Sequence, residues 1–328
     1  MTKFDFLTAG HIRFGRGQAD AAVAAVAQLG RRVLLVRGRS VGWASRFANE
    51  LGAAGCDVQE HLSIGEPTLG AVEQGRIVAR DAGVEVVVAV GGGAAIDLGK
   101  AIAALVPSEW AALTHLEGVG DGRPLVADPL PFVAIPTTAG TGAEVTKNAV
   151  IAVPDAGRKV SLRDQRMLPD LAIVDPALTD NAPREVTLAS GLDALTQVVE
   201  PYLTPRANPL TDALCQAAIP MALRALQRLA AGEDPSARDD MCFVSLCGGM
   251  ALANAGLGAV HGLAGVIGGR LGAPHGLICG RLLGPVLVEN HQALLDEGAP
   301  VHRFAELGGW MSAAWEVSQA APFGDLSV

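Results

Sequence analysis

The chain has 328 residues, of which half are hydrophobic, with 40 glycines and a single tyrosine. This length and composition are typical of an α/β enzyme with one large or two ordinary domains. The formal net charge of −9 argues against nonspecific nucleic-acid binding, which depends on a basic surface.

The first residues, Met1–Phe6, have neither the charged nor the apolar region of a signal peptide, and no apolar run reaches the roughly 20 residues that a membrane helix needs. We therefore expect a cytoplasmic protein with no membrane partner. The cysteines are odd in number and include no Cys-x-x-Cys pair, so we interpret them as reduced core thiols rather than disulfides or zinc ligands. They are Cys56, Cys215, Cys242, Cys247 and Cys279.

In the first half of the chain, strand-like patterns alternate with helix-like patterns. The expected strands are residues 4–15 (with a turn), 32–36 and the β-branched run 84–90. The expected helices are residues 18–29, 41–51 and 69–81, and a loop that begins at Gly55 leads into residues 57–61. Such alternation indicates a parallel sheet with helices on both faces.

The strand at residues 84–90 runs directly into Gly91, Gly92 and Gly93, which open a helix that continues through residue 104. Three glycines let the backbone pass close to a phosphate, and the helix N-terminus supplies free N–H groups and a partial positive charge. The turn is not Gly-x-Gly-x-x-Gly, and a tight turn without a ligand is the alternative. The strand before it and the helix after it favour phosphate or pyrophosphate binding.

A further buried strand, residues 131–136, leads into a loop that carries Thr137, Thr138 and Thr141. Hydroxyl groups and exposed amides at the carboxyl end of a strand lie where such sheets usually bind ligands. Local bonds between these hydroxyls and the backbone are the alternative. Two such loops on one sheet favour a dinucleotide over a single phosphate.

The β-branched runs stop after residue 183, and patterns rich in alanine and leucine follow. Residues 168–176 predict the last strand of the sheet, and the expected helices are residues 190–200, 209–231 and 236–254. We therefore expect a dinucleotide-binding α/β domain over residues 1–180 and a helical metal- and substrate-binding domain over residues 181–328, with a cleft between them.

The helical half carries candidate metal ligands. A helix over residues 191–200 puts Asp193 and Gln197 one turn apart on the same face, so both can reach one small target. His261 and His275 each stand beside a glycine, in a chain with only seven histidines. The alternative is that all four are ordinary polar groups of buried helices. Asp193, His261 and His275 offer the carboxylate and imidazole groups that zinc or iron takes, with a position left open for catalysis.

Taken in order, these motifs resemble the iron-containing (group III) alcohol dehydrogenases and their relatives, the glycerol dehydrogenases and maleylacetate reductases. The resemblance extends to about residue 290. It is carried by residues 91–100, 136–146, 168–176 and 191–195 and by the segments around His261 and His275. It implies an α/β N-terminal domain that binds a dinucleotide and an all-α C-terminal domain, the dehydroquinate synthase-like fold. It also implies hydride transfer between a nicotinamide and a carbonyl or alcohol, and a homo-oligomer such as a dimer.

The resemblance implies catalytic roles for Asp193, His261 and His275, and a metal set that also includes Gln197. One family histidine is thus glutamine here, and its carbonyl oxygen is a weaker and harder ligand, so a bound iron or zinc ion should be held less tightly. A second family histidine is replaced by Gly265. The residues assigned to the cofactor are Arg37, Arg39, Gly91, Gly92, Gly93, Asp97, Lys100, Thr137, Thr138, Thr141, Val145 and Lys159.

Arg37 and Arg39 follow the second strand, where the family often has an aspartate that binds the ribose hydroxyls of NAD. Guanidinium groups suit a 2′-phosphate, and no acidic residue follows until Glu50. We therefore expect NADPH to be accepted as well as, or in preference to, NADH.

The leading hypothesis is an NAD(P)-dependent oxidoreductase for a small alcohol, aldehyde or ketone, in which a divalent metal polarises the substrate oxygen. One alternative is a metal-independent reductase of the maleylacetate type, in which His261, His275 and bases such as Lys159 or Arg163 bind an oxo-acid. A lyase of the dehydroquinate synthase type and a non-catalytic dinucleotide-binding protein are further alternatives.

Overall fold

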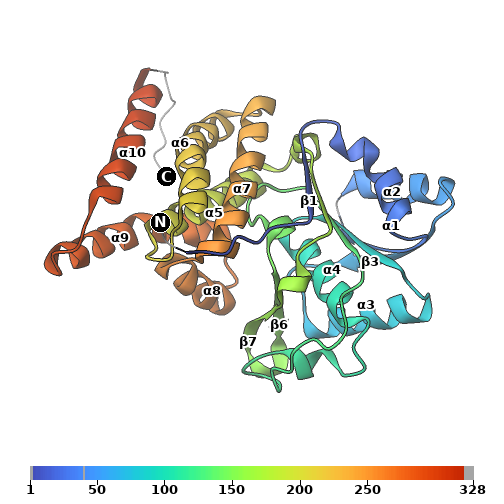
Figure 1. The fold of residues 1–328 in the computed structure, drawn as a ribbon. Coiled ribbons are helices and arrows are strands. Elements are labelled where there is room, and N and C mark those ends of the chain that lie inside the picture. The colour runs from blue at the N-terminus through green and yellow to red at the C-terminus, as the bar shows by residue number, and fades with distance from the viewer. Residues whose placement is uncertain (1–2, 40, 321–328) are drawn as a thin grey trace. The chain divides into compact units, whose positions relative to one another are not determined.

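The structure, a computed structural model, describes residues 3–39 and 41–320. Contacts divide it into two compact units. The α/β unit contains residues Leu7–Thr138 and Ala143–Thr179, and the helical unit contains residues 180–320, with 3–6 and Ala139–Gly142 (Figure 1). A parallel sheet followed by helices alone confirms the predicted fold class. The assignment of the cofactor to residues 1–180 and of the metal to residues 181–328 stays a prediction.

Six strands form one sheet in the order β1-β8-β5-β4-β2-β3, and every neighbouring pair is parallel. Their bounds are β1 (His11–Phe14), β2 (Arg32–Gly38), β3 (Asp57–Ser63), β4 (Val86–Gly91), β5 (Phe132–Pro136) and β8 (Leu171–Val174). Successive side chains of a strand point to opposite faces. Helices therefore cover the sheet on both faces: α1 (Ala22–Leu29) and α2 (Gly42–Ala53) on one, and α3 (Leu69–Asp81) and α4 (Gly93–Leu105) on the other.

The alternation is visible within β2. Val33 and Leu35 pack with α1 and α2, whereas Leu34 and Val36 pack with α3 and α4. Since both faces are buried, β4 and the central part of β2, residues 33–36, consist of apolar residues, as is typical of parallel sheets.

The predicted loop that begins at Gly55 leads into residues 57–61, which the sequence pattern left unassigned, and the structure forms β3 over residues 57–63. This strand lies at the edge of the sheet, and Glu60 is paired with Leu35 of β2. An edge strand can carry polar side chains because it is only partly covered, so it lacks the apolar pattern that identifies an inner strand. The first strand is also shorter than predicted, since β1 begins at His11.

A two-stranded antiparallel hairpin of β6 (Asn148–Val153) and β7 (Arg158–Arg163) follows a short 3-10 turn at Ala143–Val145. Lys100 of α4 forms hydrogen bonds that hold the 3-10 turn and the start of β6 to α4. Its ammonium group, only 1% exposed, donates to the carbonyl oxygens of Ala143 (2.7 Å) and Asn148 (2.9 Å) and to the hydroxyl of Thr146 (2.9 Å). Burial lowers the pKa of Lys100 to about 8, although nearby carboxylates oppose the shift.

The helical unit contains α5 (Arg184–Leu203), α6 (Pro209–Ala231), α7 (Pro235–Ala255), α8 (Ala259–Leu271), α9 (His275–Asp296) and α10 (His302–Ala320). Predicted and observed bounds agree for α6 and nearly for α7. The core of this unit includes Val198 and Tyr202 of α5, packed with Cys215 of α6 and Cys247 of α7. All five cysteines are free and buried.

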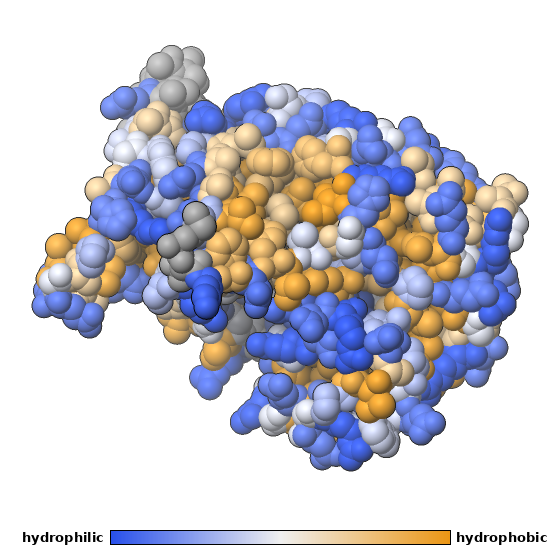
Figure 2. Space-filling view, viewed as in Figure 1, coloured by the Kyte–Doolittle hydropathy of each residue, from blue (hydrophilic) through white to orange (hydrophobic). Residues whose placement is uncertain are grey.

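No single helix in the described part of the chain is both long and apolar enough to span a membrane. The pair α7 and α8 reaches that length and apolar composition only when the two helices are taken together, and the chain bends by 103° between them. Figure 2 shows hydrophobic and hydrophilic residues interspersed on the face that it draws.

Candidate metal centre and cofactor loops

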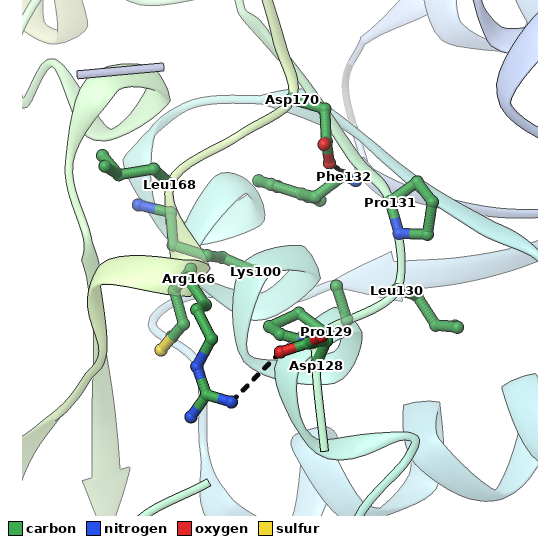
Figure 3. Close-up of a pocket in the computed structure, with 11 residues that line it drawn as sticks. Lys100, Asp128, Pro129, Leu130, Pro131, Phe132, Arg166, Leu168 and Asp170 are labelled. Carbon is green, nitrogen blue, oxygen red and sulfur yellow. Dashed lines mark hydrogen bonds and ion pairs between the residues drawn. The ribbon is translucent and has the colours of Figure 1, made fainter. Parts of the chain in front are cut away.

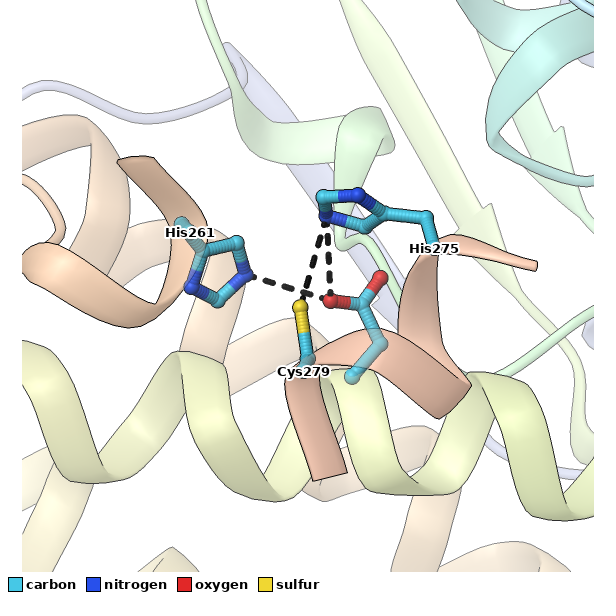
Figure 4. A group of neighbouring side chains, drawn as sticks. His261, His275 and Cys279 are labelled. Atoms are coloured by element: carbon cyan, nitrogen blue, oxygen red, sulfur yellow. Dashed lines mark hydrogen bonds and ion pairs between the residues drawn. The ribbon is translucent and has the colours of Figure 1, made fainter. Parts of the chain in front are cut away.

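Four side chains from three helices of the helical unit bring their ligand atoms within 4.8 Å of one another (Figure 4). We call this group the Asp–His–His–Cys cluster, and it consists of Asp193 of α5, His261 of α8, and His275 and Cys279 of α9. Asp193 Oδ1 lies 3.1 Å from Nε2 of His261 and 3.8 Å from Nε2 of His275. The side chains of Asp193 and His261 are 7% and 9% exposed, whereas that of His275 is 40% exposed, so the cluster opens to solvent beside His275.

Close packing between α5 and α9 explains the glycine that follows His275. A Cβ atom on Gly276 would lie 1.8 Å from the carbonyl oxygen of Ala189 and 3.1 Å from Cβ of Asp193. Only glycine lets α9 begin this near to α5, and this approach brings His275 to Asp193.

Glu200 lies behind His261. One of its carboxylate oxygens accepts from Nδ1 of His261 (2.5 Å), and the other accepts from the backbone N–H of Val260 (2.7 Å) in the first turn of α8. A Cβ on Gly258 would lie 2.8 Å from Glu200 Oε1, so glycine at the start of α8 makes room for the carboxylate. Glu200 therefore sets the orientation of the His261 ring and directs Nε2 toward Asp193.

The two histidines are shifted toward their charged forms. Burial lowers the pKa of His261, but hydrogen bonds to Asp193, Cys279 and Glu200 outweigh it and raise the pKa to about 11. A hydrogen bond to Cys279 raises the pKa of His275, against a smaller effect of burial. Since a metal ligand must be unprotonated, a cation in this cluster would displace these protons.

Gln197 lies one turn after Asp193 on α5 and is 3% exposed. Its amide nitrogen donates to the carbonyl oxygen of Thr141 (2.8 Å). A Cβ on Gly248 of α7 would lie 3.2 Å from that nitrogen. Gln197 is thus held between α7 and residues 139–142, and its role as a metal ligand stays a prediction.

The two predicted cofactor loops lie side by side, because β4 and β5 are parallel neighbours and Gly91 is paired with Pro136. The backbone N–H of Thr137 donates to the carbonyl oxygen of Gly91 (3.0 Å). A Cβ on Gly92 would lie 3.2 Å from the hydroxyl of Thr138. Gly92 caps α4 without a side-chain hydrogen bond, so the first amides of α4 have no capping oxygen from a side chain.

Several other predicted cofactor residues have partners within the α/β unit. All three N–H donors of Lys100 are used, so none remains for a cofactor, and we assign Lys100 to anchoring β6. Asp97 accepts from the backbone N–H of Val150 (2.9 Å), and burial raises its pKa to about 6. Val145 is fully buried, and Lys159 forms an ion pair with Glu66 (2.5 Å).

Arg37 at the end of β2 forms an ion pair with Glu60 of β3. Glu60 is distant from Arg37 in the chain, but the parallel pairing of β2 with β3 brings it beside Arg37 from the neighbouring strand. Arg39 is exposed.

The α/β unit contains a cavity of about 290 Å³ that is lined by Arg166, Asp128 and Asp170, among others (Figure 3). Arg166 and Asp128 form an ion pair (3.2 Å). The cavity lies at the amino ends of β5 and β8, since Phe132 begins β5 and Asp170 precedes β8. Parallel sheets bind their ligands at the carboxyl ends of the strands, so this cavity is not the predicted cofactor site.

Comparison with known protein families covers nearly the whole chain. Residues 9–176 match the model for iron-containing alcohol dehydrogenase, and residues 187–322 match the model for the C-terminal part of the Fe-containing alcohol dehydrogenase family. The chain belongs to the iron-containing alcohol dehydrogenase family.

Individual members of this family are similar over most of their length. Long-chain-alcohol dehydrogenase 1 of Geobacillus thermodenitrificans is 37% identical over 309 residues, which are 92% of this chain and 77% of the relative. The probable alcohol dehydrogenase EutG of Escherichia coli is 38% identical over 246 residues, which are 75% of this chain. The chain spans only 60% of the length of that relative.

Solved structures superpose on most of this chain. A 1,3-propanediol oxidoreductase superposes with a TM-score of 0.86 at 32% identity, over 94% of this chain and 80% of the other. A sulfoacetaldehyde reductase from Bifidobacterium kashiwanohense, solved in complex with NAD+, superposes with a TM-score of 0.80 at 27% identity, over 88% of this chain and 77% of the other.

The cluster fits the metal that the family name implies. One carboxylate, two imidazoles and a thiol within 4.8 Å are a set of donors that a divalent ion takes, and a carboxylate behind a ligating histidine is the usual support for such a site. Glu200 and Cys279 were not among the predicted site residues. Both have a signal in their spacing, since Glu200 is two helical turns after Asp193 and Cys279 is one turn after His275.

Removing the charge of Glu200 should weaken metal binding. We expect Glu200→Gln to lower the affinity for Zn²⁺ by about 10–100-fold, because the amide no longer holds the His261 ring as a carboxylate does. Competition with a chromophoric chelator measures the effect. Glu289→Gln, at an exposed position on α9, is the control that should leave affinity unchanged. Equal affinities for all three proteins would mean that Glu200 does not support a metal ligand.

Proposed function

We propose that the protein is an NAD(P)-dependent oxidoreductase that transfers hydride between a nicotinamide and a small alcohol, aldehyde or ketone, with a divalent metal ion in the helical unit. One observation carries the proposal: Asp193, His261 and His275 converge within 4.8 Å, with Glu200 behind His261, in a chain of the iron-containing alcohol dehydrogenase family. In this proposal residues 1–180 hold the cofactor and residues 181–328 hold the metal and the substrate.

Asp193 and the Nε2 atoms of His261 and His275 would hold the ion. When bound, a divalent ion supplies Lewis acidity that polarises the oxygen of an alcohol or carbonyl. Asp193 and His261 are buried and hydrogen-bonded, so their positions are set before substrate arrives. The half-exposed His275 is the side of the cluster that small molecules can reach.

The carboxyl ends of β4 and β5 would hold the cofactor. α4 begins at Gly93 with Gly92 as its N-cap and no side-chain cap, and the hydroxyl of Thr138 lies beside Gly92, so N–H and O–H donors gather where a pyrophosphate would bind. The NAD+ bound by the sulfoacetaldehyde reductase, a member of the same fold, supports a dinucleotide as the ligand of this chain.

The test is metal analysis of the purified protein together with turnover on a panel of short alcohols and aldehydes. We expect about one divalent ion per chain, loss of turnover after chelation, and recovery on adding zinc or iron. Full activity in the presence of a chelator, with no bound metal, would refute the metal-dependent mechanism. It would favour the metal-independent reductase, for which the panel includes oxo-acids. That alternative needs free bases for a carboxylate, and Lys159 is already paired with Glu66.

Cofactor preference depends on the pair of Arg37 and Glu60. We expect Glu60→Gln to raise the ratio of kcat/KM for NADPH over NADH by about fivefold, because it removes a negative charge near the expected 2′-phosphate and frees the guanidinium of Arg37. Glu50→Gln, which removes the ion pair with Arg46 on α2, is the matched control. If neither Glu60→Gln nor Arg37→Ala changed the ratio, the 2′-phosphate would not bind here.

A further inference from the structure

We propose that Cys279 is the fourth protein ligand of the metal centre, in place of the histidine that this chain lacks at position 197, and that the site consequently prefers zinc to iron. The inference rests on the proposed function, because it requires a divalent ion on Asp193, His261 and His275. It concerns which further side chain binds that ion and which ion the site selects.

The distances around Cys279 suit ligation. Its Sγ lies 3.6 Å from Nε2 of His275 and within 4.8 Å of the ligand atoms of Asp193 and His261. Two ligand atoms of one tetrahedral zinc ion lie about 3.3–3.6 Å apart, given bonds of about 2.0 Å to nitrogen or oxygen and about 2.3 Å to sulfur. The 3.1 Å and 3.8 Å distances from Asp193 to the two histidines bracket this range. The thiol therefore joins the set with only small movements.

The fold explains why the sulfur faces the cluster. His275 and Cys279 are four residues apart on α9, so they lie one above the other on the same face. Figure 4 shows both side chains directed toward the space that His261 borders from α8. Cys279 is fully buried in the same apolar core as Cys215 and Cys247, and of these three cysteines it is the one whose Sγ lies in the Asp–His–His–Cys cluster.

Gln197 has a different set of contacts. Its amide nitrogen donates to the Thr141 carbonyl at 2.8 Å, and Gly248 of α7 packs against the same amide group. The amide can offer a metal only a neutral, hard oxygen, whereas a thiolate is charged and soft. With Cys279 as ligand, the donor set resembles that of zinc sites, in which cysteine and histidine are the usual ligands.

The bond to sulfur forms between a thiolate and the ion, and the proton of the thiol passes to solvent. No oxidant or reductant takes part. Asp193, His261, His275 and Cys279 would then hold the ion, which would supply Lewis acidity at the side of the cluster that opens beside His275.

Cobalt absorption tests the proposal without relying on activity. Metal-free protein is titrated with Co²⁺ to one equivalent, and the near-ultraviolet region is examined for charge transfer from thiolate to cobalt. We expect a band that saturates at one Co²⁺ per chain, that Zn²⁺ abolishes by displacement, and that Cys279→Ser eliminates. Cys247→Ser is the matched control, since Cys247 is equally buried in the same unit but lies outside the cluster, and it should keep the band.

Competition with a chelator measures metal preference in the same proteins. We expect the wild type to bind Zn²⁺ more tightly than Fe²⁺, and Cys279→Ser to weaken Zn²⁺ binding by at least about tenfold and Fe²⁺ binding less, because the lost thiolate is a soft ligand that favours zinc. Equal losses for the two ions would overturn the preference for zinc. Circular dichroism confirms that the variants are folded. If Cys279→Ser did not fold, the wild-type spectrum would still decide, because ligation by any cysteine gives the band and non-ligation gives none.

The outcomes separate this inference from the proposed function. Stoichiometric Co²⁺ binding without a charge-transfer band, or with a band that persists in Cys279→Ser, would overturn the role of Cys279 and leave the metal centre standing. Failure to bind Co²⁺, Zn²⁺ and Fe²⁺ would overturn both.

Discussion

Asp193→Asn is expected to lower kcat/KM for alcohol oxidation by about 10³-fold, equivalent to about 4 kcal/mol of transition-state stabilisation, and to abolish binding of one metal ion per chain. Asparagine has nearly the same shape, so the packing of α5 is retained while the charge is lost. Oδ1 of Asp193 lies near Nε2 of both histidines, so the substitution removes the anionic oxygen that would bind the ion together with the two imidazoles.

Glu185→Gln is the control for this substitution, since it removes a carboxylate from the exposed first turn of the same helix. It should leave turnover and metal content unchanged. Steady-state kinetics and metal analysis of the two variants are compared with the wild type. If Asp193→Asn kept both activity and its metal, α5 would be an ordinary buried helix, and the Asp–His–His–Cys cluster would have no catalytic role.

Lys100→Met should destabilise the α/β unit by about 3–5 kcal/mol. The substitution preserves the length of the side chain but removes the ammonium donor to the carbonyl oxygens of Ala143 and Asn148, and the Ala143 oxygen then accepts from Thr146 alone. It also removes the buried cation that favours the ionised form of Asp97 and of Glu144, whose pKa burial raises to about 6 and about 7, respectively. Hydrogen exchange of the β4 and β5 amides, together with urea denaturation, measures the loss.

Lys159→Met is the matched control, because Lys159 forms a partly exposed ion pair with Glu66 rather than a buried network. Exposed pairs contribute about 0–1 kcal/mol, so this variant should be close to the wild type. Equal stability of the two lysine variants would show that the buried hydrogen bonds of Lys100 do not hold β6 to α4.

Much of the fold could be predicted because its signals are local. The apolar runs of β2, β4 and β5 reflect burial on both faces of the sheet, and the bounds of α3 and α6 follow from periodicity and from the residues that flank them. The edge strand β3 could not be predicted in the same way. Its side chains are partly exposed and its stability comes from backbone pairing with β2, which leaves no apolar pattern.

In the candidate site, too, the features visible in short segments were predictable and the contacts between distant segments were not. Asp193, His261 and His275 were identified from residue type and neighbouring glycines, but their convergence depends on the approach of α9 to α5 at Gly276. Interactions between residues far apart in the chain were not predictable. Glu60 reaches Arg37 from the next strand, and Glu200 reaches His261 across 61 positions.

The sequence by itself therefore determined the fold class, the family and three of the candidate ligands, because periodicity and residue type are properties of short segments. Only the tertiary structure decided which partners these residues have. It buried Lys100 in an internal network, paired Arg37 with an acid, enclosed Gln197 against Thr141 and brought Cys279 to the two histidines. The physical reason is that helix packing and strand order set distances between segments, and the spacing of residues along the chain does not contain those distances.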